Sequence, residues 1–141
     1  MLSEGSRPPR FTLPDTGGKR RDLRAFLGRD RIVVVFQPDR AWIDAVRAGR
    51  GAFLERDLTV LVIVPPDSPR AKETSAPPLL FLTDDGSVAR AYGARPGAAT
   101  FYLIGKDGTI KMARRGCPTS RELFGVIDAM PMRRREMRER R

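Results

Sequence analysis

The sequence predicts an α/β fold: a three-layer sandwich around a mixed sheet, with a parallel half, an antiparallel C-terminal hairpin and a final helix. Apolar strand-like runs alternate with short helical stretches along residues 11–92, which is typical of a parallel sheet. Residues 100–113 contain two strand-like runs around Gly105-Lys106-Asp107-Gly108, a strong hairpin signal. Residues 119–130 then follow a helical pattern that opens on a capping box.

The first elements are short. Residues 11–13 predict a brief strand, and residues 16–18 a turn. One amphipathic turn follows, which Gly28 closes, and its apolar residues lie at helical spacing: Leu23, Phe26 and Leu27.

The centre of the predicted sheet is the run Ile-Val-Val-Val-Phe at residues 32–36. An unbroken β-branched run is typical of a strand buried on both faces. Residues 59–64 form a second run of this kind. Between the two lies a predicted helix, weakened in its middle by Gly49 and Gly51, with these apolar residues: Trp42, Ile43, Val46, Phe53 and Leu54.

The second half of the chain continues the alternation. Residues 65–78 contain five of the twelve prolines and predict a loop with at most one helical turn, before a third strand at residues 79–82. Residues 87–92 predict a short helix that stops at Gly93. The final helix begins at a capping box of Thr119 and Glu122 and is expected to end at Pro131.

The 141 residues suit one domain, which we assign to residues 1–131, followed by an Arg-rich C-terminal extension at residues 132–141. A single cysteine forms no internal disulfide and fits a reducing cytoplasm. The apolar runs are too short for a membrane span, and the N-terminus lacks the pattern of a signal peptide. No histidine is present, which excludes Ser-His-Asp triads and imidazole metal sites, so we expect no metal and no cofactor.

The net charge of +10 rests on 23 Arg and only 4 Lys. Such a surplus attracts anionic partners. Residues 133–141 contain six Arg and two Glu, and we interpret them as a solvated helical extension with local Arg–Glu pairing. Nucleic-acid binding is the less favoured interpretation, because the tail lacks the aromatic residues on which single-strand binders stack bases.

Several stretches resemble the peroxiredoxin branch of the thioredoxin fold. They are residues 11–19 with Leu23 and 26–28, the strand at 33–36, residues 78–86 with 88–93, and residues 100–104 with 107–110. Their order and spacing cover most of residues 11–114 and imply a thioredoxin-like, peroxiredoxin-type sandwich. The C-terminal third, above all residues 127–134, resembles an uncharacterised family of bacterial thioredoxin-like domains, which implies no activity.

The resemblance implies a peroxide site whose parts have been lost. Peroxiredoxin chemistry needs a Cys thiolate, a Pro and a Thr that shape the pocket, and an Arg that lowers the thiol pKa. Pro38 matches the family's Pro, but Trp42 stands where the Thr is expected and Ala45 where the Cys is expected. The segment after Pro38 is also shorter than the family's. Arg95 is close to the expected Arg position, and Ala99, before Thr100, replaces the cis-Pro of thioredoxins.

Cys117 is the one remaining reactive candidate. It follows the second hairpin strand and precedes the final helix, so we expect it on the rim of the vacant groove, close to Trp42. There Arg114, Arg115 and the helix N-terminus are expected to lower its pKa. The favoured interpretation is nevertheless a partly exposed thiol without function, with Trp42 as a packing residue or an aromatic plug.

Three functions follow from these observations. The first is a non-catalytic, redox-inactive domain that acts through protein contacts, self-association as a homodimer included. The second is a weak thiol redox or antioxidant protein that uses Cys117. The third is an Arg-mediated binder of nucleic acid or another anionic partner.

Overall fold

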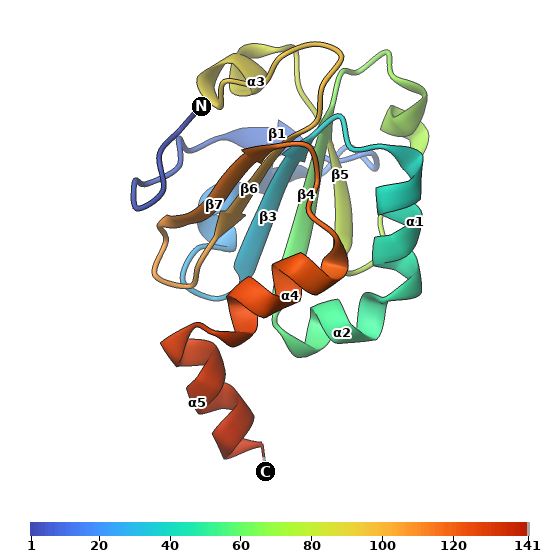
Figure 1. Cartoon of the computed structure of the whole chain (residues 1–141). Coiled ribbons are helices and arrows are strands. Elements are labelled where there is room, and N and C mark those ends of the chain that lie inside the picture. Colours follow the sequence, from blue (N-terminus) through green and yellow to red (C-terminus); the bar gives the residue numbers. More distant parts are fainter. Residues whose placement is uncertain (141) are drawn as a thin grey trace.

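The β-branched run at residues 32–36 forms the middle strand of the sheet. In the computed structural model, which describes residues 1–140, this strand is β3 (Arg31–Phe36), and all six of its residues are buried. It pairs in parallel with β4 (Leu58–Val64) and antiparallel with β6 (Thr100–Ile104). The five-stranded order is β5-β4-β3-β6-β7, with β5 (Leu79–Thr83) and β7 (Ile110–Arg115) at the edges (Figure 1). The predicted mixed sheet is confirmed.

Helices cover one face of the sheet. This layer contains α1 (Arg40–Ala48), α2 (Arg50–Glu55) and α4 (Ser120–Asp128). In Figure 1, α4 lies in front of the lower ends of the strands, α1 to their right and α2 below them. Alternate residues of β3 point into this layer. The shared core includes Val33, Val35, Ile43, Phe53 and Leu123.

The N-terminal segment and α3 (Ser87–Ala91) cover the opposite face. The segment folds into a small hairpin of β1 (Thr12–Pro14) and β2 (Arg20–Asp22), followed by the 3₁₀ turn η1 (Leu23–Ala25). This second core includes Phe11, Leu23, Ile32, Val34 and Tyr92. The two cores on either side of the sheet confirm the predicted three layers.

Local sequence explains the boundaries of these elements. Gly49 separates α1 from α2, so the long helix expected across residues 42–54 is two helices. The Pro-rich segment is a loop with one 3₁₀ turn, η2 (Pro69–Lys72), as predicted. Strand β2 was not expected, because Arg20-Arg21-Asp22 has no apolar pattern and pairs only with β1.

The end of the chain differs from its prediction. The capping box of Thr119 and Glu122 is confirmed at the start of α4. Pro131, however, begins a further helix, α5 (Pro131–Glu139), in the first-turn position that tolerates proline. The interpretation of this segment as a solvated extension is wrong for Arg133 and Glu136, because distant partners hold both side chains: Arg31, Glu55 and Lys106. The expected local pairing is present between these two residues, at 3.6 Å. Arg141 lies outside the described residues.

None of the helices described for residues 1–140 has the length and apolar character needed to cross a membrane.

Candidate functional site

Four segments meet at one edge of the sheet, and the strand register fixes their positions. Phe36, the last residue of β3, pairs with Thr100 at the start of β6, and Thr100 pairs with Arg115 at the end of β7. We call this the groove edge, defined by Phe36, Thr100 and Arg115. Pro38 and α1 follow from β3, and Cys117 and α4 follow from β7. The topology therefore brings Pro38, Thr100, Arg115 and Cys117 to this edge.

Trp42 fills space beside the groove edge. Asp39 caps α1 by accepting a hydrogen bond from the Trp42 backbone N–H at 2.8 Å, which fixes the first turn of the helix. The indole ring packs edge to face on Phe101, with ring centroids 5.9 Å apart, and its Nε1–H donates to the Pro118 carbonyl at 3.0 Å. Only 7% of the residue is exposed. Trp42 thus connects α1 to the loop that carries Cys117.

Cys117 is half-buried and packs against the core that contains Trp42. Burial raises its thiol pKa, the negative charge of Asp39 raises it further, and Arg114 lowers it only in part, so that the pKa is about 11. The expectation of a lowered pKa is therefore wrong. At neutral pH the thiol is protonated and is a poor nucleophile.

The guanidinium groups expected to activate Cys117 have other partners. Arg114 pairs with Glu122 at 3.0 Å, and Arg115 donates to the Gly93 carbonyl and the Thr100 hydroxyl, both at 2.8 Å. The N-terminus of α4 also has its own cap, because the Glu122 carboxylate accepts from the backbone N–H of Thr119. Of these groups, Arg114 lowers the pKa of Cys117 in part, and burial outweighs it.

The Pro-rich loop closes the other side of the groove edge. The Arg70 guanidinium donates to the carbonyl of Pro38, a buried residue. Glu73 forms ion pairs with Arg40 and with Arg47, the latter at 2.5 Å, and so joins the loop to α1. Sequence reasoning missed Arg70 and Glu73, because a loop without periodicity gives no signal for contacts with a helix about thirty residues away.

Arg95 lies apart from Cys117. It is exposed, on the segment between α3 and β6, and lines a cavity of about 380 Å³ with Phe36, Gln37 and Ala94. Phe36 and Ala94 belong to the core on the α3 face of the sheet, whereas Cys117 and Trp42 belong to the core on the α1 face. The structure thus brings six of the seven predicted site residues to one edge: Pro38, Trp42, Thr100, Arg114, Arg115 and Cys117. Arg95 lines a separate cavity.

The groove edge offers little chemistry in this arrangement. Its polar groups are already bonded within the chain: the Pro38 and Pro118 carbonyls, the Thr100 hydroxyl and the Trp42 indole. Its thiol has a raised pKa. Among residues 1–140, no group of three or more Cys, Asp or Glu side chains is placed to hold a metal ion.

The sequence of this chain is similar to a family of domains and to several known proteins. Residues 22–136 match the family model described as "Domain of unknown function (DUF4174)". Among curated proteins, chloroplastic peroxiredoxin Q of Suaeda salsa is 29% identical over 127 residues, and that of Gentiana triflora is 27% identical over 132 residues. Both alignments cover 79% of this chain, which spans only 59% and 58% of those proteins' lengths.

Solved structures show the same fold. Reduced 2-Cys peroxiredoxin from Plasmodium vivax superposes with a TM-score of 0.73 at 19% identity, covering 95% of this chain and 99% of its own. A putative thiol:disulfide interchange protein DsbE from Chlorobium tepidum gives 0.72 at 16% identity, with coverages of 90% and 99%. A putative thioredoxin from Neisseria meningitidis gives 0.66 at 23% identity, with coverages of 87% and 89%. The predicted peroxiredoxin-type, thioredoxin-like fold is confirmed.

Proposed function

Since the chain belongs to the family described as Domain of unknown function (DUF4174) and has a peroxiredoxin-type fold, we propose that it is a non-catalytic member of that fold which acts through protein contacts. One observation carries the proposal: the groove edge is closed by the chain's own hydrogen bonds. Trp42 donates to the Pro118 carbonyl, Arg70 to the Pro38 carbonyl and Arg115 to the Thr100 hydroxyl. A peroxide would have to break such contacts to bind there.

The state of the thiol supports the same proposal. A peroxidatic cysteine must be largely thiolate at neutral pH. Cys117, with a pKa of about 11, is almost wholly protonated. No thiolate is therefore available to attack a peroxide oxygen at neutral pH.

A peroxide-consumption assay tests the proposal. The protein is incubated with hydrogen peroxide and dithiothreitol, beside a Cys117→Ser variant and an active peroxiredoxin Q. We expect the wild type and Cys117→Ser to consume peroxide at the same background rate. Turnover that is present in the wild type and lost in Cys117→Ser would instead establish a thiol peroxidase.

Self-association is one form of the proposed contact function. Light scattering at several protein concentrations distinguishes a monomer of 15.8 kDa from a homodimer of twice that mass. A monomer at all concentrations would restrict the contacts to other proteins. The single cysteine suits a reducing compartment such as the cytoplasm, which we include in the proposal.

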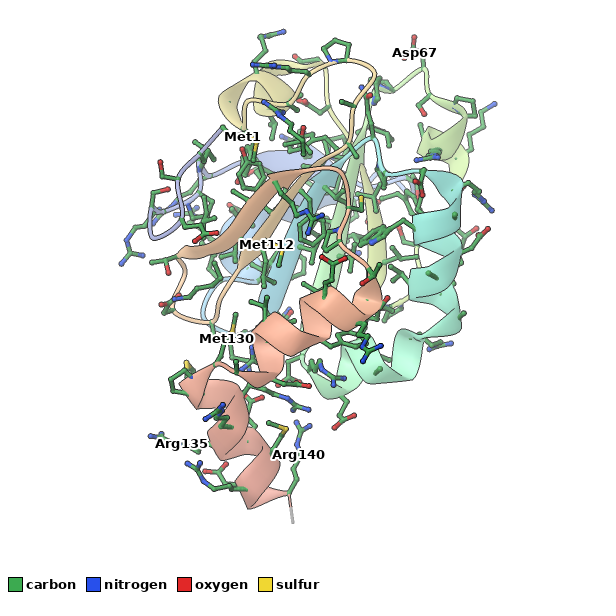
Figure 2. The ribbon with its side chains drawn as sticks, viewed as in Figure 1. Met1, Asp67, Met112, Met130, Arg135 and Arg140 are labelled. Atoms are coloured by element: carbon green, nitrogen blue, oxygen red, sulfur yellow. The ribbon has the colours of Figure 1, made fainter. Side chains whose placement is uncertain are left out.

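The exposed face of α5 supports an Arg-mediated binder as a second candidate. Arg134, Arg135 and Arg138 are exposed and make no ion pair within residues 1–140, and Figure 2 shows Arg135 pointing away from the body of the molecule. Arg133 and Arg140, by contrast, donate to Glu55. Binding to an anionic partner through the exposed face should weaken steeply as salt is raised.

The appropriate variant for this second candidate replaces only the three exposed arginines with serine. Deleting residues 133–141 would also remove Arg133 and Glu136, whose ion pairs hold α5 against the domain. We expect the triple variant to lose salt-dependent binding to single-stranded RNA while it keeps its stability. Binding that is insensitive to salt, or unchanged in the triple variant, would remove this candidate.

A further inference from the structure

The proposed function does not use the cavity that Arg95 lines, on the α3 side of the molecule. It opens where β3 and β4 end, with Phe36 and Gln37 at the end of one strand and Val64 and Pro65 at the end of the other, and α3 beside them. Figure 1 shows α3 and the loop that follows β4 at the same end of the sheet. In open α/β sheets this end is where small ligands bind. A volume of about 380 Å³ is within the range of small-molecule sites.

Two guanidinium groups line this cavity. Within residues 1–140, neither Arg90 nor Arg95 makes a side-chain hydrogen bond or an ion pair. The Arg90 Nη1 atom lies 3.1 Å from the position that a Cβ would occupy on Gly86, which also lines the cavity. The guanidinium of Arg90 therefore lies beside Gly86. The two cations approach the cavity from α3 and from the segment that follows it.

The three aspartates that line the cavity differ in their hydrogen bonds. Asp84 accepts hydrogen bonds from the backbone N–H groups of Val88 at 3.2 Å and Ala89 at 3.0 Å. Asp85 accepts from the backbone N–H of Ser87 at 3.0 Å and from its hydroxyl at 2.7 Å. Both carboxylates are thus hydrogen-bonded at the start of α3, and the charge of Asp85 also attracts Arg90.

Asp67 is the remaining acidic residue of the lining. It lies on the loop after β4, at the same end of the molecule as α3 (Figure 2), and makes no ion pair with another described residue. Arg90 and Arg95 attract an anion at this cavity, and Asp67, Asp84 and Asp85 repel it. The repulsion from each aspartate is about twice as large for a phosphate dianion as for a carboxylate, which favours a ligand with a single negative charge.

Gln37 fixes the position of the segment that carries Arg95. Its backbone adopts a left-handed conformation, with φ of 54°, directly after β3. Its side-chain Oε1 accepts a hydrogen bond from the Gly97 N–H at 2.9 Å. This bond holds the α3–β6 segment at the end of β3. The segment that carries Arg95 is therefore ordered before a ligand binds.

We propose that this cavity binds a small monocarboxylate with an apolar body. The carboxylate would interact with Arg90 and Arg95, because guanidinium groups recognise carboxylates through paired, charge-assisted hydrogen bonds. The apolar body would pack on the apolar part of the lining: Phe36, Ile63, Val64, Ala89 and Ala94. This site does not include Cys117, and it shares Phe36 with the groove edge.

Titration of the ¹⁵N-labelled protein with phenylacetate, followed by NMR, tests the proposal. We expect saturable shifts of the backbone amides of Gln37, Val64 and Arg95, with a dissociation constant in the millimolar range or tighter for so small a ligand. Arg90→Ala and Arg95→Ala should each weaken binding by about tenfold or more. Arg121→Ala is the matched control: it removes one exposed, unpaired arginine of α4 and should leave the affinity unchanged.

Two comparison ligands separate the charge from the apolar body. Benzyl alcohol keeps the ring without the charge, and inorganic phosphate keeps the charge without the ring. We expect both to bind at least about tenfold more weakly than phenylacetate. The proposal is overturned if phenylacetate gives no saturable shifts at these amides, if Arg121→Ala weakens binding as much as Arg95→Ala, or if phosphate binds as tightly as phenylacetate.

Discussion

At the scale of single residues, Trp42 contributes through both its ring and its N–H group. The ring is buried against Phe101, and the indole N–H is bonded to the carbonyl of Pro118, seventy-six residues away in the chain. A buried carbonyl that loses its donor costs more than the bond itself contributes, because the carbonyl remains without a partner. The two contributions can be separated by substitution.

Trp42→Phe keeps an aromatic ring and removes the donor. We expect it to lower the free energy of unfolding by about 1–3 kcal/mol, from the unpaired Pro118 carbonyl and the smaller ring. Trp42→Ala removes the packing as well and should cost about 3–5 kcal/mol. Urea denaturation followed by circular dichroism measures both. Equal stability of Trp42→Phe and the wild type would show that the hydrogen bond contributes nothing.

Cys117 permits a test of its electrostatic surroundings. Its pKa of about 11 results from burial and from the charge of Asp39, opposed by Arg114. The alkylation rate should therefore keep rising with pH through pH 9 and level off only near pH 11. Asp39→Asn should lower the pKa while asparagine still caps α1. A plateau near the ordinary value of about 8.5 would contradict the geometry and favour the thiol redox function.

At the scale of elements, α5 is attached to the domain mainly through charge. Arg31 and Arg133 are each only 1% exposed. Glu136 pairs with Arg31 at 3.1 Å and with Lys106 at 2.6 Å, and Arg133 pairs with Glu55 at 3.0 Å. Removing one partner of such a network leaves a buried charge without compensation, which is strongly destabilising.

The ion pairs of Glu136 make the stability of the fold depend on pH. Burial raises the pKa of Glu136, but hydrogen bonds and charge attraction from Arg31 and Lys106 outweigh it, so that the pKa is about 2 in the folded state. Because this is below the unfolded value of 4.5, the stabilisation is present above about pH 5 and is lost as pH falls toward 2. It amounts to at most about 3 kcal/mol. Urea denaturation at stepwise pH measures the loss.

Glu136→Gln should remove this part of the pH dependence and destabilise the protein at pH 7. Glu139→Gln is the matched control, because Glu139 is exposed on the same helix and makes no ion pair with a described residue. We expect it to behave as the wild type. Identical acid profiles for Glu136→Gln and the wild type would show that the α5 contacts do not stabilise the fold.

Two glycines at element junctions should respond to alanine in opposite directions. Gly116, between β7 and Cys117, has a φ of +79°, which alanine adopts only with strain, although no atom lies within 4 Å of the added Cβ. Gly116→Ala should cost about 1 kcal/mol. Gly49 has a φ of −100°, and its added Cβ meets only ordinary contacts, so Gly49→Ala should stabilise by about 0.5 kcal/mol. Thermal unfolding measures both, and equal melting temperatures would contradict the backbone assignment.

At the scale of the whole molecule, local apolar patterns sufficed to predict the sheet, because buried strands such as β3 and β4 have sequences that few other structures accommodate. The meeting of Trp42 and Cys117 followed from topology. The pKa of Cys117 did not follow from topology, because the orientation of the Arg114 and Arg115 side chains depends on their contacts with other residues: Glu122, Gly93 and Thr100. The docking of α5 did not follow from topology either, because its Arg31–Glu136 pair joins residues 105 positions apart.

The peroxiredoxin-type scaffold is intact, and this raises the question of whether adding a cysteine would restore peroxide chemistry. Ala45 stands at the position where the resemblance expects the Cys. In the structure it is an exposed residue of α1, whereas Trp42, Ile43 and Val46 are the buried ones. A thiol at position 45 would therefore face solvent, away from Thr100 and Arg115.

We therefore expect the variant with Trp42→Thr, Ala45→Cys and Cys117→Ser, which has a single thiol, to consume peroxide no faster than free cysteine. Its thiol should alkylate with an ordinary pKa of about 8.5, since an exposed cysteine is not desolvated. The matched control carries the single substitution Cys117→Ser and has no thiol. Turnover far above that of free cysteine would show that the scaffold itself activates a thiol at this position. Loss of the peroxidatic Cys would then be the only barrier to activity, and the closed groove edge would be its consequence.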